Sequence, residues 1–379
     1  EIMPSLVGSE MCIRDRRSAA DNFTQEELRQ GVEFAHAKGS VVYVVLNGFL
    51  HDQDLDELEA FLVFLEEVKI DAVIVSDLGV IEKVKQCSNI EVHLSTQASC
   101  VNAHSAKLWK KMGVTRVVLG REASVEDARI IKQNADIEVE MFIHGSMCMA
   151  YSGNCVISNF TQGRDSNRGG CAHSCRFEYG LEIDQTDLEK KKQFFMSSKD
   201  LNGLRLLEDF IKAGVDSVKV EGRMKSHLYA ATMSKVYSEA LNYYEEHKSF
   251  LSDQLEEWDK ELAKVTHRTY APVNLVEKAG EETIFNEREH DGSAQYIMIG
   301  RIVDTLKNEF IIVEVRNAFG PGDTIEILPF SASVIEHKVE SITNLMGNDI
   351  KRTKPSTLVK LPYFEAVSYT HLRAHETRH

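Results

Sequence analysis

The amino-acid sequence alternates between short apolar runs with strand character and segments with helical hydrophobic spacing. Leu55, Leu58, Leu62 and Leu65, for example, recur every three or four residues, which is typical of a helix with one buried face. The predicted strands are residues 41–46, 72–75, 92–96, 116–119, 137–143 and 217–220. Strands that alternate with helices at this rhythm predict parallel βαβ units.

Polar residues gather just past the ends of these predicted strands. They are Asn47, Asp77, Ser95, Gln97, Arg121, Glu122, His144, Glu221 and Arg223. A (β/α) barrel carries its chemistry at this position, and a doubly wound sheet also places polar groups there. Because no Gly-rich dinucleotide fingerprint and no phosphate-loop motif follows any of the strands, the pattern favours the barrel.

The periodicity changes in the last third of the chain. Short β runs are predicted at residues 296–303, 310–315, 324–328 and 333–342, with turn signals such as Gly-Pro-Gly-Asp at 320–323. We therefore expect an α/β fold, with an incomplete TIM-barrel-like (β/α) domain over residues 17–271. A polar linker is expected at 272–291 and a small all-β, barrel-like C-terminal domain at 292–366.

Both ends of the sequence resemble translated sequencing-adaptor read-through. These are residues 1–16, which include MPSLVGSEMCIRDR, and residues 367–379, VSYTHLRAHETRH. We predict that both segments are non-native and set them aside when the fold is predicted.

The net charge of −15 argues against non-specific binding to nucleic acid. Residues 144–176 run against this trend, because three arginines and one aspartate give the segment a net charge of +2. No apolar run reaches the length of a membrane span, and no secretory leader is visible. Seven cysteines in 379 residues are too few for a disulfide scaffold, so we expect a cytoplasmic protein.

Four cysteines lie in the short segment 144–176. They are Cys148, Cys155, Cys171 and Cys175, spaced C-x6-C-x15-C-x3-C with several glycines between them. Such clustering predicts a metal or iron–sulfur centre. Spacing alone does not separate an iron–sulfur cluster from a zinc site, in which His144 or His173 is a further candidate ligand.

The same segment carries a family resemblance. Residues 140–148, which contain Gly-Ser-Met-Cys, and residues 153–158 match the signature of the U32 collagenase-like peptidase family. Further matching stretches are residues 93–99, 167–171, 197–201 and 219–225. The resemblance covers nearly the whole chain between the two set-aside ends.

This resemblance implies a TIM-barrel-like catalytic domain with a 4Fe-4S cluster on Cys148, Cys155, Cys171 and Cys175. Members with this domain arrangement are similar to the TrhP-type tRNA 5-hydroxyuridine synthesis proteins, which hydroxylate the wobble uridine and use prephenate as the hydroxyl donor. Other relatives act on rRNA or on small molecules. The family normally begins with two strands and a helix that precede the point matched by Arg17, so the first two barrel strands are predicted to be missing.

Several residues are candidates for catalysis or binding. His93 and His144 are candidate general acids or bases, with hydrogen-bonded structural roles as the alternative. Glu221 and Arg223 are further catalytic candidates. Arg223 suits a carboxylate of the donor, and the alternative is an ion pair between these two residues. The remaining substrate-binding candidates are Gln97, Arg164, Asn167, Arg168 and Lys225. The three between 164 and 168 either contact RNA phosphate or donor carboxylate, or order the loop around the cluster.

The leading hypothesis is an iron–sulfur-dependent tRNA hydroxylase, with tRNA and prephenate as substrates and with homo- or hetero-oligomers formed with a paralogue. A peptidase is the alternative from another class. The sequence has neither an H-E-x-x-H motif nor a G-x-S-x-G elbow, and His144 with Cys148 is its only near histidine–cysteine pair.

Overall fold

The computed structural model describes residues 3–6, 23–180, 192–222, 225–285, 296–329, 334–364 and 371–375. The chain forms two compact units. The first comprises residues 1–224 and 269–289, and the second comprises residues 225–268 and 290–379. The predicted fold class is confirmed, since the first unit is a mixed α/β domain with a parallel sheet and the second contains a curled antiparallel sheet.

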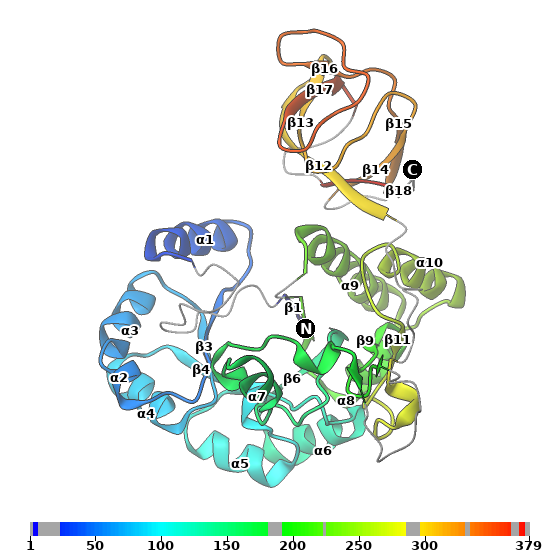
Figure 1. Ribbon diagram of the computed structural model, residues 1–379. Coiled ribbons are helices and arrows are strands. Elements are labelled where there is room, and N and C mark those ends of the chain that lie inside the picture. Colours follow the sequence, from blue (N-terminus) through cyan, green and yellow to red (C-terminus); the bar gives the residue numbers. More distant parts are fainter. Residues whose placement is uncertain are drawn as a thin grey trace. The chain divides into compact units, whose positions relative to one another are not determined.

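A parallel sheet with strand order β1-β10-β6-β5-β4-β3-β2 forms the centre of the first unit (Figure 1). The strands are β1 (Met3–Leu6), β2 (Tyr43–Leu46), β3 (Ala72–Val75), β4 (Glu91–Leu94), β5 (Arg116–Val118), β6 (Glu138–Gly145) and β10 (Ser217–Val220). Two short strands, β9 (Asp200–Asn202) and β11 (Tyr270–Ala271), pair with each other, and β9 also pairs with β6. A separate hairpin consists of β7 (Tyr179–Gly180) and β8 (Lys192–Gln193).

The helices of this unit cover the outer side of the curved row of strands (Figure 1). They are α1 (Gln25–Ala37), α2 (Asp52–Leu55), α3 (Leu58–Glu67), α4 (Leu78–Cys87), α5 (Ala103–Lys111), α6 (Val125–Ala135) and α8 (Leu207–Ala213). A further short helix, α7 (Ile157–Gln162), lies in the cysteine segment. Every residue of β3 is buried, as expected for a parallel strand that is covered on both faces.

Helix starts follow the signals in the sequence. In the sequence, Thr24 with Glu27 and Ser124 with Asp127 have the spacing of capping boxes, and their side chains form these boxes at the starts of α1 and α6. Each box satisfies amide groups at the start of a helix that have no partner within the helix.

The sheet is open, as predicted for an incomplete barrel. Its edges are β1 and β2, and within the described residues no strand joins them. The position of β1 was not foreseen, because this strand lies in the set-aside segment 1–16. It pairs in parallel with β10, from Met3 opposite Ser217 to Leu6 opposite Val220.

The described part of the predicted linker, residues 272–285, packs against the α/β unit. Val273, Leu275 and Phe285 are buried, and the amide of Phe285 donates to the carbonyl of Ser197 at 2.7 Å. The sequence analysis did not predict that these three apolar residues are buried, because the segment is polar overall. Residues 286–291 of the predicted linker lie outside the described residues.

The second unit contains helices α9 (His227–His247) and α10 (Ser252–Leu262) and a seven-stranded antiparallel sheet. The sheet has the order β15-β14-β18-β12-β13-β17-β16. Its strands are β12 (Tyr296–Leu306), β13 (Phe310–Val315), β14 (Thr324–Leu328), β15 (Ile335–Lys338), β16 (Thr343–Asn344), β17 (Leu358–Pro362) and β18 (His371–His375).

Only β12 to β15 correspond to the predicted β runs, and β18 lies in the set-aside segment 367–379. The side chain of Arg373 in β18 is fully buried and pairs with Glu326 at 2.7 Å and with Glu261 at 2.6 Å. A core of isoleucine, valine and phenylalanine side chains, including Ile302 and Phe319, fills this sheet.

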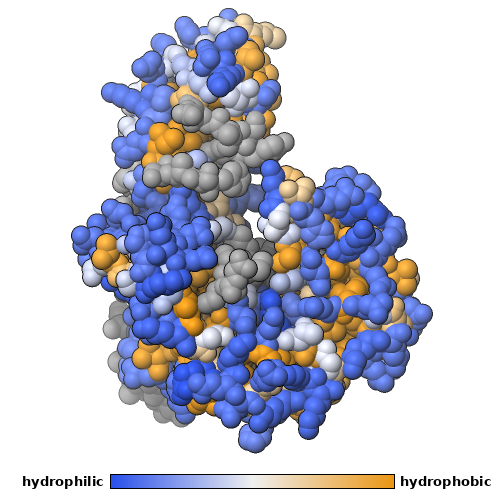
Figure 2. Space-filling view, turned by 180° about the vertical axis from the view of Figure 1, so that it is seen from behind, coloured by the Kyte–Doolittle hydropathy of each residue, from blue (hydrophilic) through white to orange (hydrophobic). Residues whose placement is uncertain are grey.

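The described helices include none with both the length and the apolar composition needed to cross a membrane. Hydrophilic residues also cover most of the face shown in Figure 2.

Candidate active site

A cavity of about 340 Å³ lies in the α/β unit at the carboxyl ends of its parallel strands. Strand residues that line it are Val45, Ile74, Val118, Phe142 and Lys219, and residues just past strand ends are Asn47, Ser95, Gln97, Arg121 and Glu221. The cysteine segment supplies most of the remaining lining. The predicted position of the chemistry, past the strand ends, therefore coincides with a concave site.

Two glycines let the cysteine segment approach the strand ends. Gly145, the last residue of β6, has a φ of 112°, and a Cβ atom there would collide with the carbonyl oxygen of Glu221. Gly153 has a φ of 76°, and a Cβ atom there would collide with the backbone of Gln97. Only glycine combines this backbone conformation with such close contacts.

Hydrogen bonds hold the segment over the cavity. The hydroxyl of Ser198 donates to the carbonyl of Met147 at 3.1 Å, and the side-chain amide of Asn167 donates to the carbonyl of Cys155 at 2.8 Å. The amide of Ser146 donates to the Glu221 carboxylate at 3.2 Å. These bonds fix the backbone next to the first two cysteines of the cluster pattern.

The structure brings Cys148, Cys155, Cys171 and Cys175 to the same cavity. None of the four is in a disulfide, and each retains some accessible surface. Among the described residues, no group of three or more His, Cys, Asp or Glu side chains is arranged to hold a single metal ion.

The environment of the thiols affects their acidity. Protein surrounds Cys148 on most sides although the cavity leaves it accessible, and this burial raises the pKa of its thiol, while Arg121 and Arg176 act in the opposite direction. Burial also raises the pKa of Cys175; Arg176 lowers it, and the other three cysteines raise it. The four thiols are thus close enough to interact electrostatically, and without a bound metal Cys148 and Cys175 favour the protonated form.

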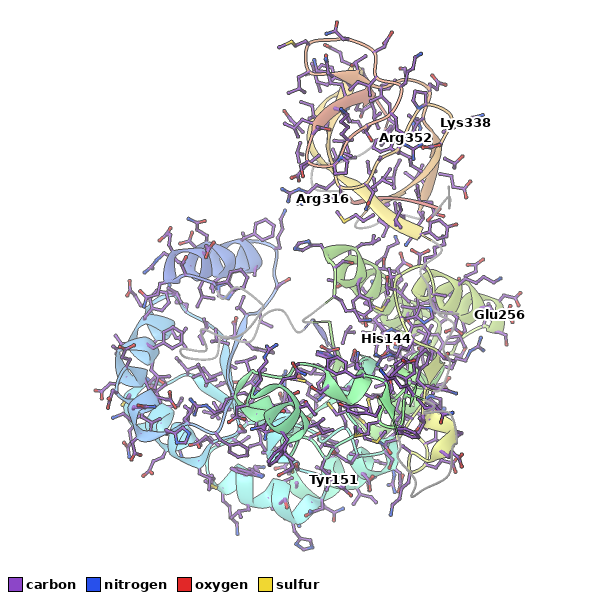
Figure 3. All side chains as sticks on the ribbon, viewed as in Figure 1. His144, Tyr151, Glu256, Arg316, Lys338 and Arg352 are labelled. Carbon is purple, nitrogen blue, oxygen red and sulfur yellow. The ribbon has the colours of Figure 1, made fainter. Side chains whose placement is uncertain are left out.

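The two candidate histidines lie away from the cavity lining. His93 in β4 is 1% exposed, its ring packs edge-on against Tyr43, and its Nδ1 has no hydrogen-bond partner among the residues that the structure describes. Burial lowers the pKa of His93 to about 4, with a further contribution from Arg116, so the ring is neutral near pH 7. His144 lies near the end of β6 (Figure 3). Its Nε2 lies 3.2 Å from the hydroxyl of Tyr270.

A buried ion network lies below the cavity. The carboxylate of Glu140 in β6 lies 2.6 Å from the Lys219 ammonium and 3.5 Å from the Arg116 guanidinium. Burial raises the pKa of Glu140, but Lys219 and Arg116 outweigh it, so that the pKa lies below the ordinary value. Arg116 also pairs with Glu138 at 2.7 Å.

The remaining predicted site residues divide between the cavity and other places. Glu221, Gln97, Arg164 and Asn167 line the cavity. Arg168 does not, because its guanidinium pairs with Asp54 at 2.9 Å and also donates to the carbonyl of Phe49.

Two further predicted site residues, Lys225 and Arg223, are not among the described residues that line the cavity. Lys225 belongs to the second unit, where its ammonium donates to the carbonyl of Thr266 at 3.0 Å. Arg223 lies outside the described residues.

The sequence prediction left Arg121, Lys219 and Arg176 out of the site, although all three line the cavity. Two signals were present. Arg121 follows a strand end like the candidates that were chosen, and Lys219 is the one charged residue of the predicted strand 217–220.

Comparison with known proteins identifies the family. Residues 7–284 match peptidase family U32, and residues 294–373 match the peptidase family U32 C-terminal domain. The chain belongs to peptidase family U32. The cysteine segment and cavity of this U32 protein lie within the first of the two matched regions.

Three relatives have informative names. The "tRNA hydroxylation protein P1" of Bacillus subtilis (strain 168) is 39% identical over 355 residues, which cover 91% of this chain and 83% of the relative. The "23S rRNA 5-hydroxycytidine C2501 synthase" of Escherichia coli (strain K12) is 31% identical over 336 residues, or 86% of this chain and 50% of the relative. The "Collagenase" of Porphyromonas gingivalis (strain ATCC BAA-308 / W83) is 30% identical over 370 residues, which cover 93% of this chain and 87% of the relative.

Proposed function

We propose that this U32 protein is an RNA hydroxylase that converts the wobble uridine of tRNA to 5-hydroxyuridine. The observation that carries the proposal is a cavity with four cysteines, in a chain similar over most of its length to a protein named for tRNA hydroxylation. The similarity to a 5-hydroxycytidine synthase supports the same chemical class, because its product is also a hydroxylated pyrimidine.

Replacing a C–H bond by a C–OH bond oxidises the base by two electrons, so the hydroxyl donor that gives up its OH group must take up these two electrons and a proton. Amino-acid side chains alone do not carry out this chemistry. We propose a 4Fe-4S cluster on Cys148, Cys155, Cys171 and Cys175, which when bound supplies one-electron transfer. The donor set supports this assignment, because four thiols share one cavity. A zinc ion on the same thiols is the alternative cofactor.

The cavity offers groups for the base and for the hydroxyl donor, for which prephenate is our candidate. Glu221 is the predicted catalytic residue that lines the cavity, and we assign its carboxylate to accept the proton that leaves C5 of the uracil. Gln97 and Asn167 present amide groups suited to the polar edge of a uracil ring.

Tyr151 offers a stacking surface for an unpaired base. It lies on the cysteine segment after β6 (Figure 3), lines the cavity and is 65% exposed. Bases that leave a single-stranded loop stack on such aromatic rings, and anticodon loops contain unpaired bases.

The test is mass spectrometry of tRNA nucleosides from cells that lack the gene and carry either the wild-type protein or a Cys148→Ser variant. We expect 5-hydroxyuridine to disappear in the deletion, to return with the wild type and to stay absent with Cys148→Ser. Cys87→Ser is the matched control, because Cys87 ends α4 and does not line the cavity. Unchanged 5-hydroxyuridine in the deletion strain would remove the proposal.

A peptidase is the second candidate, because of the similarity to a collagenase. The site supports it less well. A nucleophilic cysteine requires a lowered thiol pKa and a nearby base, whereas burial raises the pKa of Cys148. In addition, the ring of His144 contacts Tyr270. Collagen cleavage that persists after removal of iron and is lost in Cys148→Ser would favour the peptidase.

A further inference from the structure

Arg121 lines the cavity and, among the described residues, packs against an aromatic ring rather than a carboxylate. Within the described part of the chain, its guanidinium forms no ion pair and no hydrogen bond, and its Nε is fully buried. In contrast, Lys219 pairs with Glu140 at 2.6 Å, and Arg116 pairs with Glu138 at 2.7 Å. A buried donor on a charged group without a partner is costly, which indicates that a ligand completes it.

The surrounding structure holds Arg121 in place. Its amide donates to the hydroxyl of Ser152 at 3.0 Å, and its carbonyl accepts from the side chain of Asn274 at 3.1 Å. Its guanidinium carbon lies 4.0 Å from the centre of the Phe142 ring, a favourable cation–π position. Because the ring and the backbone bonds already fix the side chain, little conformational entropy remains to be lost when an anion binds.

The cavity around Arg121 indicates the kind of anion. Its volume of about 340 Å³ is within the range of small-molecule sites. The strands contribute the apolar side chains of Val45, Ile74 and Val118 to its wall, and Phe142 extends this apolar surface to the guanidinium. An arginine fork next to an apolar wall suits a carboxylate on a compact hydrocarbon body.

We propose that Arg121 is the carboxylate anchor of this cavity and binds the small organic acid that serves as the hydroxyl donor. The identity of the acid as donor rests on the proposed function, whereas the carboxylate site itself rests on the geometry of Arg121. Arg176 also lines the cavity, and its positive charge adds to the attraction for an anion.

The experiment is calorimetric titration of prephenate into the anaerobically purified full chain, with inorganic phosphate as a separate probe. We expect the wild type to bind prephenate, Arg121→Gln to bind it about 10- to 100-fold more weakly, and Arg121→Lys to lie between them, as for the loss of charged hydrogen bonds. Arg129→Gln is the matched control, because Arg129 is exposed on α6 and pairs with Glu126 within the same helix.

Iron and sulfide content, the thermal unfolding midpoint and tRNA affinity are measured on the same samples. The proposal requires all three to stay at wild-type values in Arg121→Gln while prephenate binding weakens. Loss of iron would mean that Arg121 only balances the charge of the thiolates. Lower tRNA affinity with unchanged prephenate binding, or displacement of prephenate by phosphate, would mean that it binds RNA phosphate.

Loss of iron, lower tRNA affinity alone, or displacement of prephenate by phosphate would each refute the proposal that Arg121 binds the donor carboxylate. A wild-type protein that does not bind prephenate would refute it as well. If Arg121→Gln unfolds, the comparison of Arg121→Lys with the wild type decides the question, and equal prephenate affinity of those two proteins refutes the requirement for the guanidinium. Failure of the proposed function is recognised separately, as tRNA hydroxylation that does not depend on the gene while prephenate binding still depends on Arg121.

Discussion

Replacing Glu140 by glutamine tests the buried ion network below the cavity. Glu140 is 0% exposed, and Lys219, its partner at 2.6 Å, is almost as deeply buried. The substitution keeps the size of the side chain but leaves the Lys219 ammonium without a counter-charge. Arg116 is affected less, because it retains Glu138 at 2.7 Å.

Removal of one partner of a buried ion pair costs about 3–5 kcal/mol, because the other charge stays buried without compensation. We expect Glu140→Gln to lower the free energy of unfolding of the α/β unit by about 3 kcal/mol, at the lower end of that range. We choose the lower end of the range because Arg116 keeps a second carboxylate partner, Glu138, after the substitution. Replacing both residues, as in Glu140→Leu with Lys219→Met, is expected to recover most of the loss, since an apolar pair of similar size is often neutral or stabilising.

Urea unfolding near pH 7 measures the effect. The chain has two tryptophans, Trp109 in α5 of the first unit and Trp258 in α10 of the second. In a Trp258→Phe background, the fluorescence of Trp109 therefore reports on the unit that contains Glu140. Glu59→Gln is the control, because it breaks an exposed pair with Lys83 that is worth at most about 1 kcal/mol.

The pH dependence gives a second measurement. Because the folded-state pKa of Glu140 lies below its ordinary value of 4.5, the ion pair contributes fully above pH 4.5 and is lost as the pH falls through the folded-state value. The difference between wild type and Glu140→Gln should therefore shrink in acid. A loss near pH 7 no larger than that of Glu59→Gln would refute the reasoning.

Three further outcomes follow from the site. Burial lowers the pKa of His93 from 6.5 to about 4, so its neutral ring contributes its full share of the free energy of unfolding above pH 6.5. This contribution should fall by up to about 1.4 kcal/mol per pH unit as the pH drops from 6.5 towards 4. In urea unfolding, His93→Gln should flatten this slope. Gly153→Ala should lower iron content, because its Cβ collides with the Gln97 backbone, and wild-type iron would contradict this. Tyr151→Ala should weaken tRNA binding about 5- to 150-fold with iron content unchanged, because a stacked base contributes about 1–3 kcal/mol. Phe34→Ala, a similarly exposed control on α1, should leave tRNA binding unchanged.

Local patterns in the sequence predicted a large part of the fold. Alternating apolar runs and helical spacing predicted the strands of the parallel sheet other than β1, and the Thr24 and Ser124 capping boxes predicted where α1 and α6 begin. These features depend on a few neighbouring residues, so they can be read without knowledge of the tertiary structure. The strands β16 and β17 were not predicted, because they are short and their pairing partners are distant in the sequence.

The site was predicted less completely than the fold. Position at or past a strand end selected Gln97 and Glu221, which line the cavity, but it also selected His93 and His144, which do not. The direction of a side chain relative to the curved sheet separates these groups, and this direction depends on the register of strands far apart in the sequence.

The sequence by itself determined the order of helices and strands, the family and the clustering of Cys148, Cys155, Cys171 and Cys175, since each depends on spacing along the chain. Only the tertiary structure decided which charges are neutralised. It placed Glu140 beside Lys219, across 79 positions of sequence, and placed Arg121 over Phe142 with no carboxylate partner among the described residues. Such pairing depends on distance and burial in space, and these are set when the sheet assembles.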